Sequence, residues 1–299
     1  MPDRPYIFIR DIPNERLSLL AIAREVERRG LPGVWAPSNG DNIALLLGVL
    51  ERTERIEVGT GIANIYMRHP VTMAQGASLI EELHPGRFVL GLGVSHRPNY
   101  SRFGLAVGKP LDDMRRYVER MRQEAAGAPF PRVVLAALRR KMTALAGEVS
   151  EGAIWANAIR SHLQTSLREV PAEKRGSFLV GNLIVSAISD SRAEAEAAAR
   201  RGMLNYFRLD NYLNYFEEAG YGAEASAARA AMGRGGAEEE LLAAISDRFL
   251  ADCCLVGTAA EVREQARAFM DAGVTHLVLS PASARGREAA VADTLAAFG

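Results

Sequence analysis

Two neighbouring stretches of the sequence decide the fold: TERIEVGTGIANIYMRHP at residues 53–70 and HPGRFVLGLGVSHRPN at residues 84–99. Each contains an apolar, β-rich run, Ile56–Ile65 in the first and Phe88–Val94 in the second. Pro70 suits the first position of a helix, where its missing N–H group would have no partner in any case. The predicted order is therefore strand, helix, strand, which is typical of a parallel sheet.

The same alternation extends over the rest of the chain. Six further apolar runs predict strands, at Tyr6–Ile9, Gly33–Ala36, Val133–Ala137, Ala153–Asn157, Leu179–Ala187 and His276–Ser280. With the first two they make eight strands, the number that closes a small barrel, so we predict an α/β fold of the (β/α)8, or TIM, barrel type. A chain of 299 residues has the length of one such barrel, and we expect a single domain over residues 1–299.

Several polar residues and glycines predict where helices begin and end. Asn14 is a candidate N-cap of the first helix, and Gly30 is its expected C-terminal stop. Ser191 with Glu194, and Thr258 with Glu261, have the spacing of capping boxes.

One segment, at about residues 202–252, interrupts the alternation between the seventh and eighth strands. It contains the aromatic run NYFRLDNYLNYF at residues 205–216, followed by a helical tract rich in Ala and Glu. We interpret it as an insertion over the barrel mouth. Two roles are open: a mobile lid that faces the substrate, or a satellite core or oligomer contact built from its Tyr and Phe side chains.

Composition excludes several classes of function. Lys and Arg number 36 and Asp and Glu also number 36, and no basic run is present, so we expect no nucleic-acid partner. No stretch of about 18 apolar residues and no charged leader is found, so we expect no membrane partner and a cytoplasmic location. The histidines lack metal-ligand spacing, and adjacent Cys253 and Cys254 are expected to be reduced thiols.

In TIM barrels the active site lies on the loops that follow the strands. Here those loops carry VWAPS at 34–38, T-x-R-I-x-x-G-T from Thr53, R-H-P at 68–70, G-R-F-x-L-G-L-G from Gly86 and SEGAIWAN at 150–157. This ordered set resembles the luciferase-like monooxygenase superfamily, and especially its branch that uses the deazaflavin coenzyme F-420. The resemblance covers Asn14–Asn157 and Val256–Pro281 and is poor over Met203–Asp252.

The resemblance implies an oxidoreductase that transfers a hydride between coenzyme F-420 and a small organic substrate, and relatives are commonly homodimers. An FMN-dependent monooxygenase, supplied with reduced flavin by a separate reductase, is the alternative within the enzyme class. A non-catalytic binding or structural barrel is a third possibility. It arises because Ser38-Asn39 and His96 stand where the sugar-phosphate dehydrogenase branch has an Asp-His pair and a Glu.

The resemblance also implies roles for individual residues. Gly61 and Ile62 would form a cis peptide in a bulge against the back of the cofactor ring, and His96 and Arg97 would hold the cofactor phosphate. Asn39 and His96 are the polar groups expected nearest the reacting centre. The full set of implied cofactor contacts is Ser38, Gly61, Ile62, Asn64, Val94, Ser95, His96, Arg97, Asn99, Asn157 and Ala158.

Overall fold

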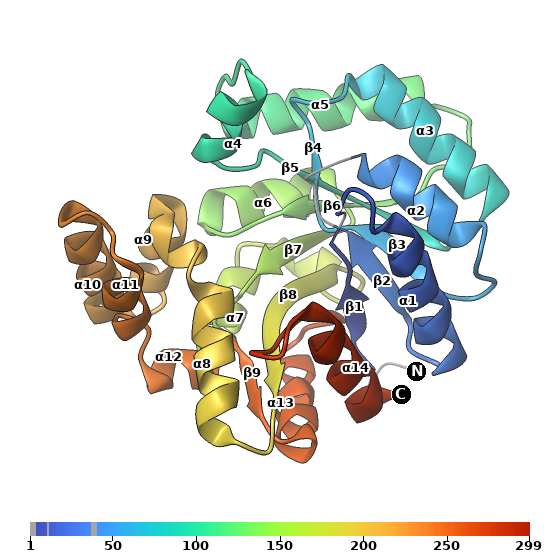
Figure 1. Cartoon of the computed structure of the whole chain (residues 1–299). Coiled ribbons are helices and arrows are strands. Elements are labelled where there is room, and N and C mark those ends of the chain that lie inside the picture. The colour runs from blue at the N-terminus through green and yellow to red at the C-terminus, as the bar shows by residue number, and fades with distance from the viewer. Residues whose placement is uncertain (1–3, 11, 37–40) are drawn as a thin grey trace.

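The computed structural model describes residues 4–10, 12–36 and 41–299, and its strands form a closed barrel surrounded by helices (Figure 1). Neighbouring strands are parallel, and β8 and β1 both pair with β10, which closes the ring. The predicted (β/α)8 barrel is confirmed. Its eight strands are β1 (Tyr6–Phe8), β2 (Gly33–Ala36), β3 (Glu57–Thr60), β5 (Phe88–Gly93), β6 (Arg132–Ala136), β7 (Gly152–Ala156), β8 (Leu179–Ile188) and β10 (His276–Ala282).

Two short strands extend this ring. β4 (Ala63–Asn64) continues the line of β3 and pairs with β5, and β9 (Leu255–Gly257) pairs with the end of β8. The helices outside the insertion are α1 (Arg16–Arg28), α2 (Asn42–Leu50), α3 (Pro70–Leu83), α4 (Arg97–Phe103), α5 (Pro110–Glu124), α6 (Arg140–Val149), α7 (Arg160–Leu167), α8 (Arg192–Met203), α13 (Ala259–Asp271) and α14 (Arg287–Phe298), with a 3-10 turn at Ala172–Lys174.

Side chains fill the interior of the barrel. The fully buried Trp35 lies across the backbone of Gly59 on the neighbouring strand, so closely that a Cβ at residue 59 would be 2.4 Å from its ring. The interior cluster consists of Tyr6, Trp35, Val89, Val134, Ile154, Leu179 and Val278. Because these side chains fill the interior of the barrel, a ligand must bind outside it, at the carboxyl ends of the strands.

The insertion predicted between the seventh and eighth strands folds into short helices at one side of the barrel (Figure 1). They are the 3-10 turn η2 (Tyr206–Arg208), α9 (Asp210–Glu218), α10 (Gly222–Gly233), α11 (Glu238–Ala243) and α12 (Asp247–Cys253). Phe207, Phe216 and Phe249 are fully buried, with ring centroids 4.7–5.3 Å apart. These rings form a satellite core, one of the two roles expected from the sequence, and the mobility of the segment stays a prediction.

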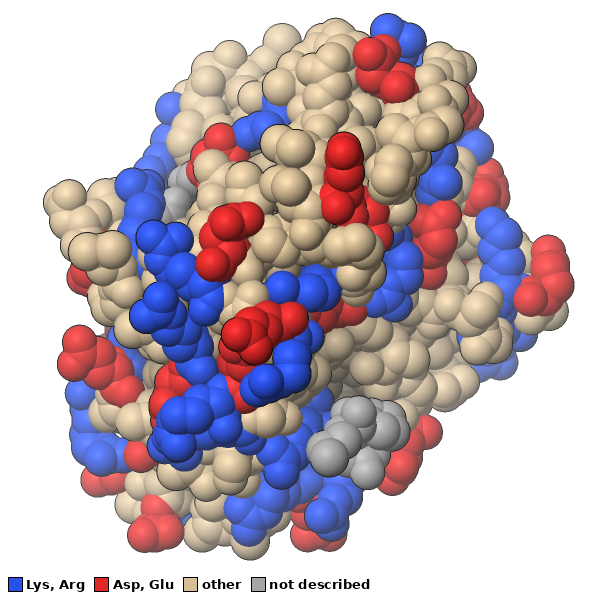
Figure 2. Space-filling model, turned by 90° about the vertical axis from the view of Figure 1, so that its right-hand side faces the viewer, with Lys and Arg blue, Asp and Glu red and all other residues tan. Residues whose placement is uncertain are grey.

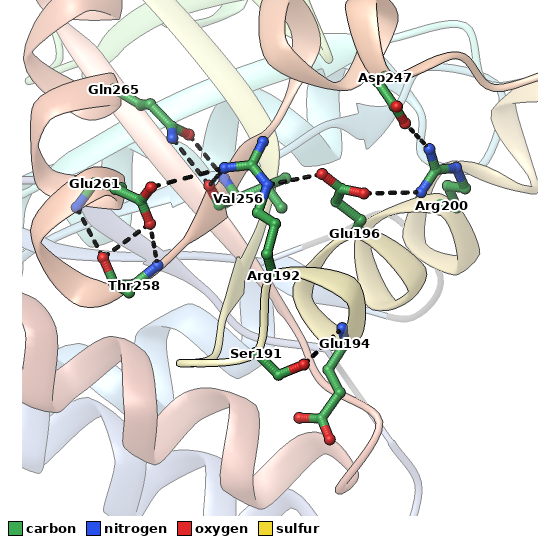
Figure 3. Close-up of polar contacts among 10 residues, drawn as sticks. All are labelled: Ser191, Arg192, Glu194, Glu196, Arg200, Asp247, Val256, Thr258, Glu261 and Gln265. Carbon is green, nitrogen blue, oxygen red and sulfur yellow. Dashed lines mark hydrogen bonds and ion pairs between the residues drawn. The ribbon is translucent and has the colours of Figure 1, made fainter.

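A chain of ion pairs links the insertion to the barrel helices (Figure 3). Glu196 of α8 accepts from Arg192 at 2.7 Å and lies 3.7 Å from Arg200, which pairs in turn with Asp247 at the start of α12. These side chains are partly exposed, and exposed pairs contribute at most about 1 kcal/mol each. The aromatic core must therefore provide most of the attachment.

The helix termini follow the sequence prediction in most places. Gly30 adopts positive φ at the end of α1, and Thr258 and Glu261 form a complete capping box. The prediction for Asn14 was wrong. Asn14 has φ of 69° and Glu15 occupies the N-cap position, because a tight left-handed turn precedes α1 and keeps Asn14 one residue outside it.

The satellite core predicts a large loss of stability when a central ring is removed. We expect Phe216→Ala to lower the free energy of unfolding by about 3–5 kcal/mol, because it leaves a cavity among packed rings. The control is Leu17→Ala, which removes a side chain that is 80% exposed and should change stability by no more than about 0.5 kcal/mol. Equal effects of the two variants in denaturant unfolding would contradict the packing argument.

Candidate active site

The candidate site is the barrel mouth, where the loops after β3, β5 and β7 carry most of the residues predicted from the sequence. Ser38 and Asn39 follow β2 and lie outside the described residues. The other predicted positions are Gly61, Ile62 and Asn64 after β3, Val94 to Asn99 after β5, and Asn157 and Ala158 after β7. The fold therefore brings these segments to the same end of the barrel.

The bulge after β3 is present, but its peptide bonds are trans. Pairing of β3 with β5 ends at Gly59, and the Thr60 hydroxyl bridges the gap by donating to Gly91 O and accepting from Gly91 N, both at 2.7 Å. Gly61 N donates to Ala36 O at 2.6 Å. No peptide bond in the described part of the chain is cis, so the predicted cis Gly61–Ile62 bond was wrong. With trans peptides, Gly61 N has a partner on β2 and Ile62 O has a partner on α2, so the bulge is held without a cis bond.

Ile62 lies directly on the backbone of Gly93. A Cβ at residue 93 would be 2.8 Å from Ile62 Cγ2, so only glycine allows this contact. Asn42 fixes the bulge from α2 by donating to Ile62 O at 2.9 Å. Asn64 pairs with Gly93 in the sheet and accepts from Tyr66 N at 3.0 Å. The result is an apolar wall beside the end of β5.

The loop after β5 contains a strained backbone position. Ser95 has φ of 65°, a conformation that costs a residue other than glycine about 1–3 kcal/mol. Asn99 donates to Ser95 Oγ at 2.9 Å, which holds the turn closed. Arg97 begins α4, so the loop runs straight into a helix N-terminus. Such strain is maintained only where the surroundings impose it, and it is frequent at ligand-binding sites.

His96 lies beside the insertion. Its ring centroid is 5.6 Å from that of Tyr212, and among the described residues no carboxylate pairs with it. Burial lowers the pKa of His96 below its usual value, so the imidazole is neutral near pH 7. This does not suit the expected role of a cation that holds a phosphate. A neutral imidazole can still donate or accept a hydrogen bond there.

The loop after β7 is held by hydrogen bonds on several sides. Asn157 has φ of 58°; its N–H donates to Leu183 O at 2.6 Å, and its carbonyl accepts from Cys253 Sγ at 3.4 Å. Asn157 Nδ2 is buried and makes no hydrogen bond of normal geometry, although the neighbouring Tyr206 hydroxyl lies close enough for the Asn157 side chain to lower the pKa of Tyr206. A buried donor without a well-formed bond costs about 1–3 kcal/mol. Ala158 N, by contrast, already donates to Asn182 Oδ1 at 3.0 Å. Of the two predicted residues, Asn157 is therefore the one with a free group.

The site also contains three tyrosines of the aromatic run at residues 205–216, for which the sequence left open a lid or a satellite core. Tyr206 and Tyr212 pack with ring centroids 4.8 Å apart, and Tyr212 contacts His96. The Tyr215 hydroxyl accepts from Ile159 N at 3.0 Å and so fixes the loop after β7. The aromatic run at residues 205–216 was the available signal, but its contact with two barrel loops depends on the tertiary fold.

These features fit a flat organic cofactor. The wall of Ile62 on Gly93 offers an apolar surface, and the orphaned Asn157 Nδ2 offers a hydrogen bond to an acceptor on the ligand. In the described part of the chain, no three His, Cys, Asp or Glu side chains come close enough to hold a metal ion. A search of the same part for a helix long and apolar enough to span a membrane finds none.

Comparison with known proteins connects this site to a family. An uncharacterized protein of Mycobacterium tuberculosis is 28% identical over 254 residues, which is 71% of this chain and 74% of that protein. The coenzyme F420 dependent tetrahydromethanopterin reductase from Methanopyrus kandleri superposes with a TM-score of 0.78 at 16% identity and covers 98% of this chain and 97% of its own.

A third similar structure contains a different cofactor. The oxygenating constituent of 3,6-diketocamphane monooxygenase from Pseudomonas putida, in complex with FMN, has a TM-score of 0.67 at 14% identity and covers 100% of this chain and 97% of its own. At such low identity both structures support the fold alone. The sequence model of the luciferase-like monooxygenase family, however, matches residues 16–276. The chain therefore belongs to the luciferase-like monooxygenase family.

Proposed function

We propose that this protein is an oxidoreductase that transfers a hydride between coenzyme F-420 and a small organic substrate. The observation that carries the proposal is the apolar wall of Ile62 on Gly93, with the orphaned Asn157 Nδ2 on the other side of β6. A flat ring with polar edges matches both. The choice of F-420 over flavin follows the resemblance of the sequence motifs, R-H-P at residues 68–70 among them, to the branch that uses F-420.

In this proposal the deazaflavin, when bound, supplies the hydride chemistry, and the protein supplies position and surroundings. Ile62 and Gly61 would hold one face of the ring, and Asn157 Nδ2 would donate to an acceptor on the cofactor. Arg97 and Ser95, at the end of the loop after β5, would hold the phosphate. Neutral His96 and the Tyr212 ring would exclude water from the site where the substrate binds.

The runner-up function is an FMN-dependent monooxygenase that receives reduced flavin from a separate reductase. The FMN complex with the same fold favours this alternative, and oxygen consumption with reduced FMN would identify it. A non-catalytic barrel would bind a cofactor without oxidising its reduced form in the presence of any acceptor.

A side-by-side titration of the purified protein with coenzyme F-420 and with FMN tests the choice of cofactor. We expect tighter binding of F-420, and a Gly93→Ala variant that binds it at least about fivefold more weakly, because the added Cβ displaces Ile62 and overpacking costs about 1–3 kcal/mol. Gly176→Ala is the matched control, since a Cβ there has no neighbour within 4 Å. Tighter binding of FMN would reject the deazaflavin proposal.

The lowered pKa of His96 predicts a pH dependence of stability with a definite sign. The unfolded chain protonates His96 near its ordinary pKa of about 6.5, whereas the folded protein resists protonation because the ring is buried. The wild type should therefore lose stability relative to His96→Gln as the pH falls below 6.5, with a constant difference between pH 7 and pH 8. Unfolding free energies of both proteins at pH 5, 6, 7 and 8 measure this. A wild type that gains stability in acid would show that His96 is held as a cation.

We also propose that the protein is a homodimer that associates through α3. Leu79 and Leu83 are one helical turn apart on α3 and are 49% and 52% exposed. Figure 2 shows that charged side chains gather on the lower half of this face, whereas its upper part, over α2 and α3, is mostly uncharged. The net charge of zero adds no repulsion between two copies.

The dimer proposal predicts that a Leu79→Glu/Leu83→Glu variant is a monomer in size-exclusion chromatography with light scattering. The variant would no longer bury the two leucines at the interface, and the glutamates of the two copies would repel each other. Leu17→Glu, at an 80% exposed position on α1, should leave the dimer intact. A wild type that is monomeric at all concentrations would refute the interface.

A further inference from the structure

A hollow at the carboxyl ends of β1 and β10 lies outside the proposed cofactor contacts. Its floor is apolar, with Leu19 of α1 and Val291 of α14 among its lining residues, and Phe8 forms one wall. Three polar side chains line the same hollow: Arg10 after β1, Ser280 of β10 and Arg287 at the start of α14. Two arginines beside apolar side chains suit a ligand whose acidic group enters the small hollow and whose apolar body lies at its opening.

The two arginines have unused donors. Arg287 Nη1 is buried and has no hydrogen-bond partner, although Nη2 of the same side chain pairs with Glu15. Arg10 is exposed and makes no hydrogen bond or ion pair with any residue that the structure describes. Even with the Glu15 carboxylate counted, the hollow carries a net positive charge. An orphaned, buried N–H of an arginine is costly, and an oxyanion is the acceptor that best relieves this cost.

The hollow lies beside the barrel mouth. Phe8, which lines the hollow, would be 3.5 Å from a Cβ at Gly61, where the bulge after β3 begins. A ligand whose acidic group lies in the hollow therefore has its body next to the proposed cofactor contacts.

We propose that Arg10, Ser280 and Arg287 form an oxyanion subsite that holds the carboxylate of a small organic acid with an apolar body, the substrate of the enzyme. This assignment of a substrate class rests on the proposed function, since it places the acid beside the proposed cofactor. Arg10 and Arg287 donate to the carboxylate, Ser280 adds a hydroxyl donor, and Phe8 contacts the body. The subsite gives the barrel mouth a preference for acids over neutral analogues.

The same oxyanion chemistry could come from the cofactor, through a phosphate or a carboxylate, so the experiment has two arms. In the first, benzoate and its neutral analogue benzamide are titrated into the full-length protein and followed by ligand-observed NMR. We expect benzoate to bind more tightly than benzamide. Arg10→Ala and Arg287→Ala should each lower the affinity for benzoate roughly tenfold and leave the affinity for benzamide unchanged.

The matched control is Arg285→Ala, two residues from Arg287, which removes the same charge from an arginine that pairs with Asp293 instead. It should leave benzoate binding unchanged. If it weakens benzoate as much as Arg287→Ala does, or if benzoate binds no better than benzamide, the subsite is refuted. Glu15→Gln removes the competing carboxylate and should tighten benzoate binding; weaker binding would also count against the subsite.

In the second arm, coenzyme F-420 and FMN are titrated into the same variants. Unchanged cofactor affinity supports a substrate subsite, whereas a tenfold loss of cofactor affinity with unchanged benzoate binding overturns it in favour of a cofactor contact. The two proposals fail separately. If neither cofactor binds the wild type but benzoate still depends on Arg10 and Arg287, the oxyanion site stands and the proposed function is wrong.

Discussion

The candidate site depends on one contact, the seating of the bulge after β3 on the glycine backbone of β5. Thr60 Oγ1 takes the place of the missing ladder bonds to Gly91, and Ile62 occupies the space that a side chain at residue 93 would fill. If β3 paired with β5 without interruption, Gly61 and Ile62 would be part of the strand and could not form the apolar wall at the mouth. Because the pairing is interrupted between Gly59 and Ala63, Ile62 can lie at the end of the barrel, while Gly61 N and Ile62 O find partners on β2 and α2.

The insertion is the second feature on which the candidate site depends. Although it lies far from β7 in the sequence, it contacts the loop after β7. Its aromatic core positions Tyr215, whose hydroxyl binds the backbone of Ile159, and Cys253, whose thiol binds the carbonyl of Asn157. These two bonds help to hold Asn157 in its left-handed conformation. The satellite core and the site are thus coupled, because loss of packing in α9 or α12 would release the loop after β7.

Much of the fold could be predicted from the sequence because each barrel strand is a short apolar run between turn signals. Gly33–Ala36 was predicted to the residue, and the other strand ends differ by one or two residues, apart from the break at Gly61 and Ile62. That break could not be foreseen from local pattern. It depends on acceptors and donors from β2, β5 and α2, whose positions are fixed only when the barrel closes. The predicted cis peptide failed for the same reason.

The sequence predicted which loops carry the candidate residues, and the structure places those loops at one end of the barrel, while the roles of the residues stay predictions. The charge of His96 depended on surroundings that the sequence does not show: Tyr212 of the insertion packs against its ring, and burial lowers the pKa of His96 and favours the neutral form. An arginine is not neutralised in this way, because its guanidinium remains charged in almost any protein environment. Positive charge at this end of the barrel therefore comes from arginines such as Arg10, which lies two residues after β1 and is exposed. A buried neutral centre with cations at its edge favours an acidic ligand whose charged group lies outward and whose apolar part lies inward.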